Sequence, residues 1–184
     1  MSGCARTRLI AMALAAGLAA SALFAGAEPA RAEETVSQRD FTVQVIQRHN
    51  THRADHHAPP LGEDRSLSAR ARDAAARLAA SGELTPDAVR DAAGDFGVNL
   101  AWTNGGALDG GAVVEAWYSQ APAYDYDRPG FAPETGAFTQ VVWAASGSAG
   151  AGYAAKPDGG YLAIVLYAPR GNVEGQFPDN VLKP

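Results

Sequence analysis

The sequence contains a single cysteine, Cys4, which lies in an N-terminal segment with the features of a secretory signal peptide. Arg6 and Arg8 give that segment a positive start, Leu9 to Ala25 form its apolar stretch, and Ala30-Arg31-Ala32 places small residues around a cleavage point. Cleavage after Ala32 leaves 152 residues without cysteine, which excludes disulfides, thiol nucleophiles and cysteine-ligated metal sites from that chain. A chain of about 150 residues can be held by its core alone.

Long apolar runs and basic charge are also scarce. The N-terminal run barely reaches the length of about 20 residues that spans a bilayer, and no second run or stop-transfer charge follows it. We therefore predict a cleaved signal peptide at residues 1–32 and secretion to the extracellular space, with an uncleaved anchor as the alternative. The formal net charge is −5, and −7 once residues 1–32 are removed. Without a basic cluster, binding to nucleic acid or to an anionic membrane by charge is not expected.

Motifs of common catalytic and cofactor sites are missing. All four histidines fall within residues 49–57, and no Gly-x-Ser-x-Gly motif accompanies them, which argues against a serine hydrolase triad. The glycine-rich motifs that bind phosphates or dinucleotides are absent as well. The sequence predicts no cofactor.

The chain does contain helix and strand patterns without regular βαβ alternation. After a loose lead-in at residues 33–40, apolar spacing and capping residues predict helices at about 41–53, 66–80, 86–92 and 112–119. Strands are predicted at 149–156 and 161–168 around a Pro-Asp-Gly-Gly turn, whereas 138–144 fits either a helix or a strand. No linker or repeat divides residues 41–184. We predict one domain of the α+β class or a three-layer sandwich.

Several ordered motifs carry a family resemblance: His49-Asn50-Thr51-His52-Arg53, Gly97-Val98-Asn99-Leu100-Ala101, Trp117-Tyr118, Thr135 to Trp143, and Tyr167 to Val173. In this order and spacing they resemble the CAP superfamily, also called the SCP domain, which includes cysteine-rich secretory proteins, antigen 5 and pathogenesis-related 1 proteins. The resemblance spans about residues 41–184. It implies an α–β–α sandwich around a small, mainly antiparallel sheet.

The resemblance also implies an open cleft, which holds two histidines and two glutamates in the best-known members. The matching positions here are Pro86, Val98, Gln120 and Ala137, and the match at Pro86 is the loosest. Zinc requires imidazole, thiolate or carboxylate donors, and general acid–base catalysis requires a titratable group. None of the four side chains provides either. The resemblance therefore implies a cleft without metal ligands or catalytic residues.

Other motif residues receive structural roles from the same resemblance: His49, Asn50, Arg53, Asn99, Trp117, Tyr118, Thr139, Gln140, Trp143, Gly171 and Asn172. Taken alone, His49, His52 and His56 are spaced i, i+3, i+7 and could bind zinc or copper from one helix face. The family match favours a structural role for them. Gly136 and Gly171 are expected to serve turns and close backbone approach.

Aromatic residues gather in the loop from Pro122 to Pro133, namely Tyr124, Tyr126 and Phe131. Such residues either pin a loop against the core or form a binding surface. Tyr126 and Gln120 are the candidate ligand contacts. We interpret Glu115 and Asp125 as solvated surface carboxylates.

The family includes lipid- and sterol-binding members, and here the cleft positions are neutral or apolar. We therefore predict a secreted, non-catalytic binding module whose partner is a small apolar ligand, such as a lipid or sterol-like molecule. The alternative is an extracellular protein-interaction or envelope-associated module with a vestigial cleft. A metal-assisted hydrolase, as proposed for some relatives, is less favoured because its donors are missing.

Overall fold

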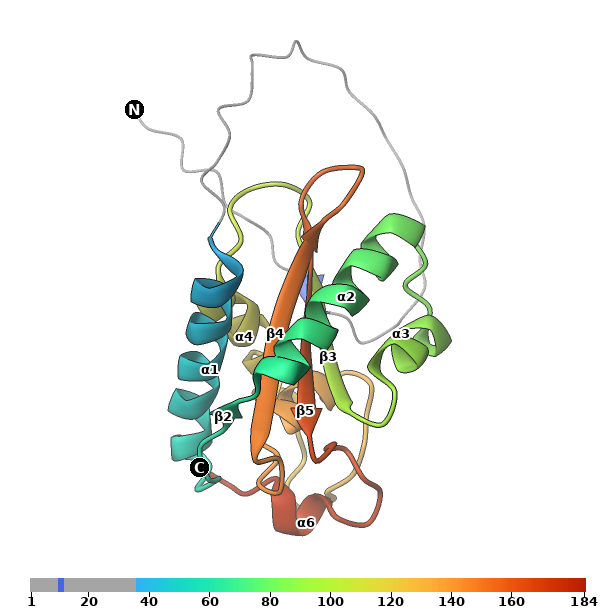
Figure 1. The fold of residues 1–184 in the computed structure, drawn as a ribbon. Coiled ribbons are helices and arrows are strands. Elements are labelled where there is room, and N and C mark those ends of the chain that lie inside the picture. The colour runs from blue at the N-terminus through green and yellow to red at the C-terminus, as the bar shows by residue number, and fades with distance from the viewer. Residues whose placement is uncertain (1–9, 12–35) are drawn as a thin grey trace, which may run out of the picture.

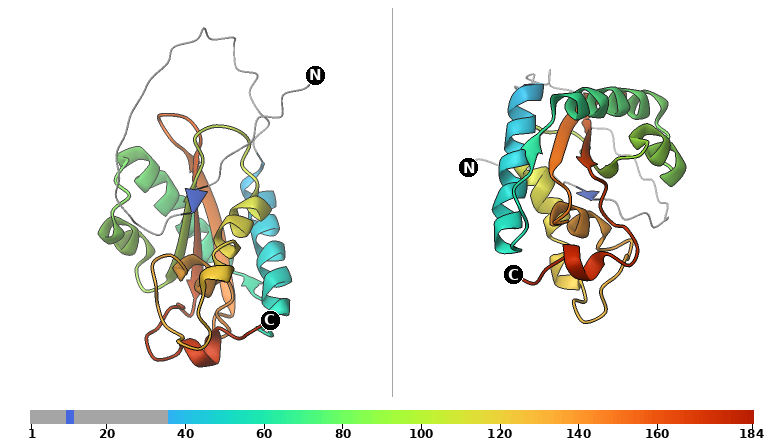
Figure 2. Two further views of the ribbon diagram at one scale, coloured as in Figure 1. Left: turned by 180° about the vertical axis from the view of Figure 1, so that it is seen from behind. Right: turned by 60° about the horizontal axis from the view of Figure 1, so that its bottom comes forward.

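The computed structural model describes residues 10–11 and 36–184, so most of the predicted signal peptide, residues 1–32, lies outside the described residues. The described elements form three layers (Figure 1). A central sheet is covered on one face by α1 (Gln38–Asp55) and α4 (Gly110–Tyr118), and on the other face by α2 (Arg65–Ser81) and α3 (Pro86–Ala93). Figure 2 shows this layering from behind and from below. The predicted three-layer α–β–α sandwich is confirmed.

The sheet has the strand order β1-β3-β5-β4-β2. Its long strands are β3 (Gly97–Trp102), β4 (Ser148–Ala155) and β5 (Tyr161–Ala168), which pair antiparallel. The two-residue strand β2 (Gly62–Glu63) pairs parallel with β4, and β1 (Ile10–Ala11) pairs antiparallel with the end of β3. Since β1 falls within the predicted signal peptide, cleavage would leave the outer edge of β3 open.

Alternating side chains of β5 divide the core between the two faces of the sheet. Ala163, Val165 and Tyr167 enter the cluster formed with α1, α4 and α5 (Gly136–Val141). Leu162, Ile164 and Leu166 enter the second cluster, with α2 and α3. A strand covered on both faces is apolar at nearly every position, which explains why residues 161–168 carry a continuous apolar run.

Glycines in β4 allow α2 to lie close to the sheet. A Cβ atom at Gly150 would come 2.1 Å from the backbone nitrogen of Ser68, and one at Gly152 would come 2.4 Å from the backbone nitrogen of Arg72. The buried face of α2 is itself rich in alanine. Small side chains on both sides therefore set the short distance between this helix and the strand.

Caps and boundaries follow the sequence signals closely. The Thr85 side chain accepts a hydrogen bond from the Ala88 backbone nitrogen and so caps α3, with Pro86 at the first helical position. The stretch 138–144, which fitted either a helix or a strand, lies in and just after the short helix α5. The remaining elements are a 3₁₀ turn at Ala121–Ala123, between α4 and α5, and the C-terminal helix α6 (Phe177–Asn180).

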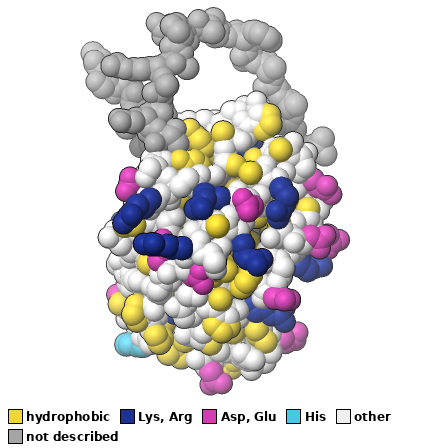
Figure 3. Space-filling model, viewed as in Figure 1, with side chains coloured by type: hydrophobic (Ala, Val, Ile, Leu, Met, Phe, Trp, Pro, Cys, Tyr) yellow, Lys and Arg dark blue, Asp and Glu magenta, His cyan; other side chains and the backbone are white. Residues whose placement is uncertain are grey.

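The face that carries α2 shows positive and negative side chains interspersed with apolar ones (Figure 3). Four arginines of α2 are exposed, but Asp73 lies among them and Asp64 caps the start of the helix. This face therefore presents no patch of a single sign. In the part of the chain that the structure describes, no helix is both long and apolar enough to cross a bilayer.

Candidate ligand-binding cleft

A cavity of about 550 Å³ lies at the edge of β3, between α3 and the segment 131–137. Because β3 is near the edge of the sheet, residues from both helical layers line the cavity, from α3 on one side and from α5 on the other. Most of its lining is apolar: Pro86, Val89, Ala93, Phe96, Val98, Leu100, Phe131, Pro133 and Ala137. The polar side chains that line it are Arg90, Asn99, Arg170 and Asn172.

Three of the four positions that the family resemblance places in the cleft meet in this cavity. Pro86 comes from the start of α3, Val98 from β3 and Ala137 from α5. These residues are distant in sequence, so the fold brings them together. The three substitutions by uncharged residues make this wall of the cavity apolar.

Gln120, the fourth position, is not among the residues that line the cavity. Its side-chain oxygen accepts hydrogen bonds from the backbone nitrogens of Ala137 and Phe138, each at 3.1 Å. Nitrogens of a first helical turn have no partner inside the helix, so Gln120 acts as the cap of α5. Its expected role as a ligand contact is thus replaced by a positioning role behind the Ala137 wall.

The two asparagines of the lining hold the cavity wall together. The Asn99 side chain donates to the Ala137 carbonyl at 3.0 Å. The Asn172 side chain donates to the Gly136 carbonyl at 2.8 Å and accepts from the Thr139 hydroxyl at 2.6 Å. Asn172 has a φ of 55°, a left-handed conformation that asparagine tolerates better than most residues. Both amides therefore serve the shape of the cleft.

Phe131 is the aromatic residue of the loop that reaches the cleft. It is 60% exposed, and a Cβ atom at Gly136 would come 2.8 Å from its ring, so the glycine makes room for it. Tyr124, by contrast, is buried and packs edge-on against Tyr126, with ring centroids 4.9 Å apart. The Lys183 ammonium lies 6.0 Å from the Tyr126 ring centroid.

Tyr126, one of the two candidate ligand contacts, does not line the cavity. Burial raises the pKa of its hydroxyl to about 12, with smaller contributions from Tyr118 and Tyr124. Nothing in the sequence separates Phe131 from the tyrosines of the same loop, because all are aromatic and lie between prolines. Only the packing shows which ring faces the cleft.

Three histidines, two in α1 and His56 at its C-terminal end, face different partners. His49 donates from Nδ1 to the Val45 carbonyl at 2.8 Å, and its Nε2 lies 2.8 Å from the Tyr167 hydroxyl. His56 donates from Nδ1 to the Leu182 carbonyl at 2.7 Å, and its Nε2 lies 3.0 Å from the Tyr118 hydroxyl. Ring nitrogens that already hold fixed partners favour the structural interpretation.

His52 is the third member, and its Nε2 lies 2.9 Å from an Oε1 of Glu115. Arg48 approaches the same oxygen at 3.3 Å, and the His52 ring stacks on Tyr118 with centroids 3.6 Å apart. Glu115, expected as a solvated carboxylate, is half-exposed and links α1 to α4. Over residues 10–11 and 36–184, no three His, Cys, Asp or Glu side chains are placed to hold a metal ion.

Arg53 is fully buried and connects α1 to the segment after α5. Its guanidinium donates to the carbonyls of Pro59, Val141, Trp143 and Ser146 at 2.8, 3.2, 2.8 and 2.8 Å. Burial lowers its pKa to about 10. The side chain thus holds distant segments of the backbone together, which is a structural role.

The remaining motif residues have similar structural tasks. Asn50 exchanges two hydrogen bonds with the backbone of Leu61, and Trp117 donates from its indole to the Leu100 carbonyl. Gln140 accepts from the Gly171 nitrogen at 3.0 Å. A Cβ atom at Gly171 would come within 2.7 Å of the Gln140 amide and 2.8 Å of the Trp143 ring, which confirms the predicted close approach.

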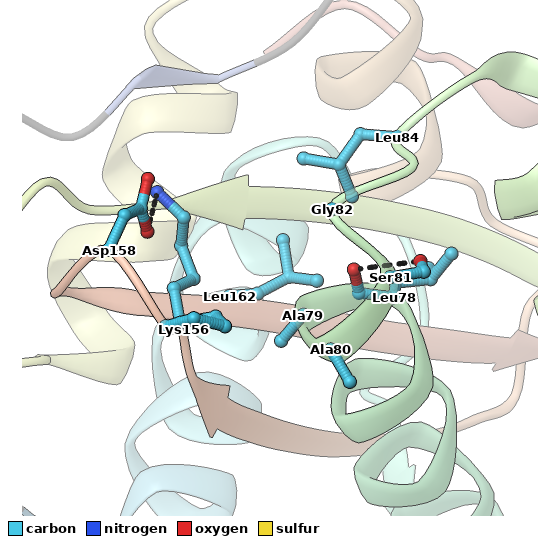
Figure 4. Close-up of a pocket in the computed structure, with 10 residues that line it drawn as sticks. Leu78, Ala79, Ala80, Ser81, Gly82, Leu84, Lys156, Asp158 and Leu162 are labelled. Atoms are coloured by element: carbon cyan, nitrogen blue, oxygen red, sulfur yellow. Dashed lines mark hydrogen bonds and ion pairs between the residues drawn. The ribbon is translucent and has the colours of Figure 1, made fainter.

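A second cavity, of about 440 Å³, lies toward the other end of the sheet (Figure 4). Leu78, Leu84 and Leu162 line it, and the Lys156–Asp158 ion pair, with 3.3 Å between nitrogen and oxygen, stands at its side. None of the four family cleft positions lines it. The candidate site is therefore the cleft at β3.

Comparison with known proteins agrees with the family resemblance and with the α–β–α fold. A model of the family described as "CAP: Cysteine-rich secretory protein family" matches residues 46–168. The chain belongs to the CAP family. The human Golgi-associated plant pathogenesis-related protein 1 is 36% identical over 152 residues, covering 80% of this chain and 96% of that protein. The tobacco pathogenesis-related protein 1C is 35% identical over 144 residues, covering 77% of this chain and 80% of that protein.

Solved CAP-type structures share the fold of this chain. The structure of BmVAL-1 superposes with a TM-score of 0.61 at 18% identity, covering 84% of this chain and 87% of that one. At this identity the likeness concerns the fold alone.

Proposed function

We propose that this CAP protein is a secreted, non-catalytic binding module that holds a small apolar or amphipathic ligand in the cleft at β3. The observation that carries the proposal is the wall formed by Pro86, Val98 and Ala137. At these positions the best-known members of the family place charged or metal-binding residues, and here the same positions are apolar.

The size and chemistry of the cleft support this proposal. A volume of about 550 Å³ lies within the range of roughly 300–1,000 Å³ typical of small-molecule sites. Apolar walls do not have to lose bound water from charged groups when a ligand enters, so they favour the burial of an apolar molecule. No carboxylate, imidazole or thiol stands among the described residues that line the cleft, which favours binding over acid–base or metal chemistry.

Secretion is part of the proposal and rests on the predicted signal peptide at residues 1–32. It agrees with the secretory family to which the chain belongs. A mass of the 152-residue chain in the culture medium would support it. A cell-associated chain that retains residues 1–32 would contradict it.

The binding proposal is tested by filling the cleft. Ala137 is half-buried, and its side chain lines the cavity. We expect Ala137→Trp to abolish binding of Nile red, an uncharged apolar dye, measured by fluorescence titration. Ala76→Trp, at an exposed position of α2 away from the cleft, is the matched control and should bind like the native protein. Equal dye binding by both variants, or no binding by the native protein, would contradict the proposal.

A second candidate function is an interaction module that uses the exposed Phe131 as a protein contact. Because Tyr124 and Tyr126 pack inward, this loop offers a single exposed ring instead of a broad aromatic patch. Recovery of one specific protein by the native chain, its loss in Phe131→Ser and its retention in Ala137→Trp, which fills the cleft, would favour this alternative.

A further inference from the structure

The charged residues of the cleft have one sign. Arg90 and Arg170 line it, and none of the described lining residues is Asp or Glu. The protein as a whole is acidic, with a formal net charge of −5, so two cations at one cavity do not follow from composition.

The two arginines differ in their availability to a ligand. Arg90 pairs with the exposed carboxylate of Asp87 at 2.9 Å. Arg170 is exposed and makes no hydrogen bond or ion pair with the described part of the chain. It follows β5 and Pro169 and precedes the Gly171-Asn172 turn, whose contacts with Gln140 and Gly136 fix the backbone. A free guanidinium thus extends from an anchored backbone beside an apolar cavity.

The neutral polar groups of the cleft are partly engaged. Asn99 and Asn172 each donate one amide hydrogen to a carbonyl of the wall, those of Ala137 and Gly136. The strongest available donor for a ligand is therefore Arg170, whose planar fork matches two oxygens of a carboxylate or phosphate.

We propose that the ligand of this cleft is an amphiphile with an anionic head, a carboxylate or phosphate monoester, which Arg170 binds while the apolar tail lies against Val98, Phe131 and Ala137. This inference rests on the proposed function, since it specifies the ligand class of the same site. Arg170 is then the residue that determines head-group specificity.

The expected size of the effect follows from the exposure of Arg170. An exposed ion pair contributes up to about a factor of five to binding, and salt weakens it because the screening length falls to about 8 Å at physiological ionic strength. The preference for an anionic head should therefore approach this upper value of roughly fivefold at low salt and should shrink as salt is added.

The experiment measures displacement of Nile red by three ten-carbon amphiphiles below their micelle concentrations: decanoate, decyl phosphate and decanol. We expect decanoate, decyl phosphate or both to compete roughly fivefold better than decanol. In Arg170→Gln that ratio should fall to about one while decanol binding stays unchanged. Arg170→Lys should restore part of the ratio. Arg77→Gln removes an equal charge from the exposed face of α2 and should leave the ratio intact.

The outcomes separate this inference from the proposed function. Dye binding with equal competition by all three amphiphiles overturns the anionic-head inference and leaves the binding module standing. A preference that persists in Arg170→Gln overturns the role of Arg170. Failure of the native protein to bind dye and amphiphiles alike overturns both proposals.

Discussion

The buried imidazole of His49 should make the stability of the protein depend on pH. Burial is the main cause that lowers the pKa of His49 from 6.5 to about 4, and the positive charge of Arg53 adds to it. The unfolded chain keeps the ordinary pKa, so between pH 6.5 and pH 4 the unfolded state binds the additional proton. Stability is therefore present above pH 6.5 and is lost as the pH falls through this window.

The magnitude follows from the difference between the two pKa values. Each pKa unit corresponds to about 1.4 kcal/mol, so the full loss on reaching pH 4 is about 3 kcal/mol. At pH 5 the loss is already about 2 kcal/mol, while most carboxylates remain ionised. The range from pH 7 to pH 5 therefore isolates the histidine contribution.

Urea unfolding of the native protein and of His49→Gln at pH 7 and pH 5 tests this expectation. The variant lacks the titrating ring. Between pH 7 and pH 5 its unfolding free energy should therefore fall by about 2 kcal/mol less than that of the native protein. His57→Asn replaces an exposed histidine with a φ of 56°, which asparagine tolerates, and should keep the native pH dependence. An equal pH dependence in the native protein and His49→Gln would refute the reasoning.

Three further substitutions test the packing. Arg53→Met removes four hydrogen bonds to carbonyls, three of them buried, and at about 1 kcal/mol for each buried bond the loss should reach about 3 kcal/mol in urea unfolding; an effect below about 1 kcal/mol would contradict the network. Gly150→Ala should cost about 1–3 kcal/mol because its Cβ meets the backbone of α2, whereas Gly147→Ala, with no atom within 4 Å, should be tolerated. Gln120→Ala should lower the melting temperature by uncapping α5, and Gln120→Glu should largely retain it; equal losses would argue against the cap.

Much of the fold could be predicted because its signals are local. Two runs of apolar and small residues around a glycine-rich turn define the β4–β5 hairpin, and Thr85-Pro86 marks the start of α3. The short helix α5 could not be assigned, since six residues do not distinguish helical from strand periodicity. Its helical state is fixed by tertiary contacts, among them the cap from Gln120.

The site was predictable in part for a different reason. Motif matching identified Val98 and Ala137 as cleft positions, and the structure places both in one cavity. It could not show that Gln120 points its oxygen at α5, or that Phe131 reaches the cleft while Tyr126 turns toward Tyr124. Those choices depend on side-chain packing between distant segments, which no local pattern encodes.

The way the cleft residues differ from the family pattern bears on the choice between a binding site and a vestigial cleft. A cavity without a ligand gains stability when larger apolar side chains fill it, because each void loses packing contacts. Here the substituted positions carry the small side chains of Val98 and Ala137, and about 550 Å³ stays open beside them. Meanwhile Asn99 and Asn172 keep their hydrogen bonds to the wall.

An open cavity with supported walls and altered polarity favours a changed ligand over an abandoned site, and Ala137→Trp tests that preference directly. If it raises the stability and native binding proves absent, the cleft is vestigial; if it removes binding, the open volume is the functional feature.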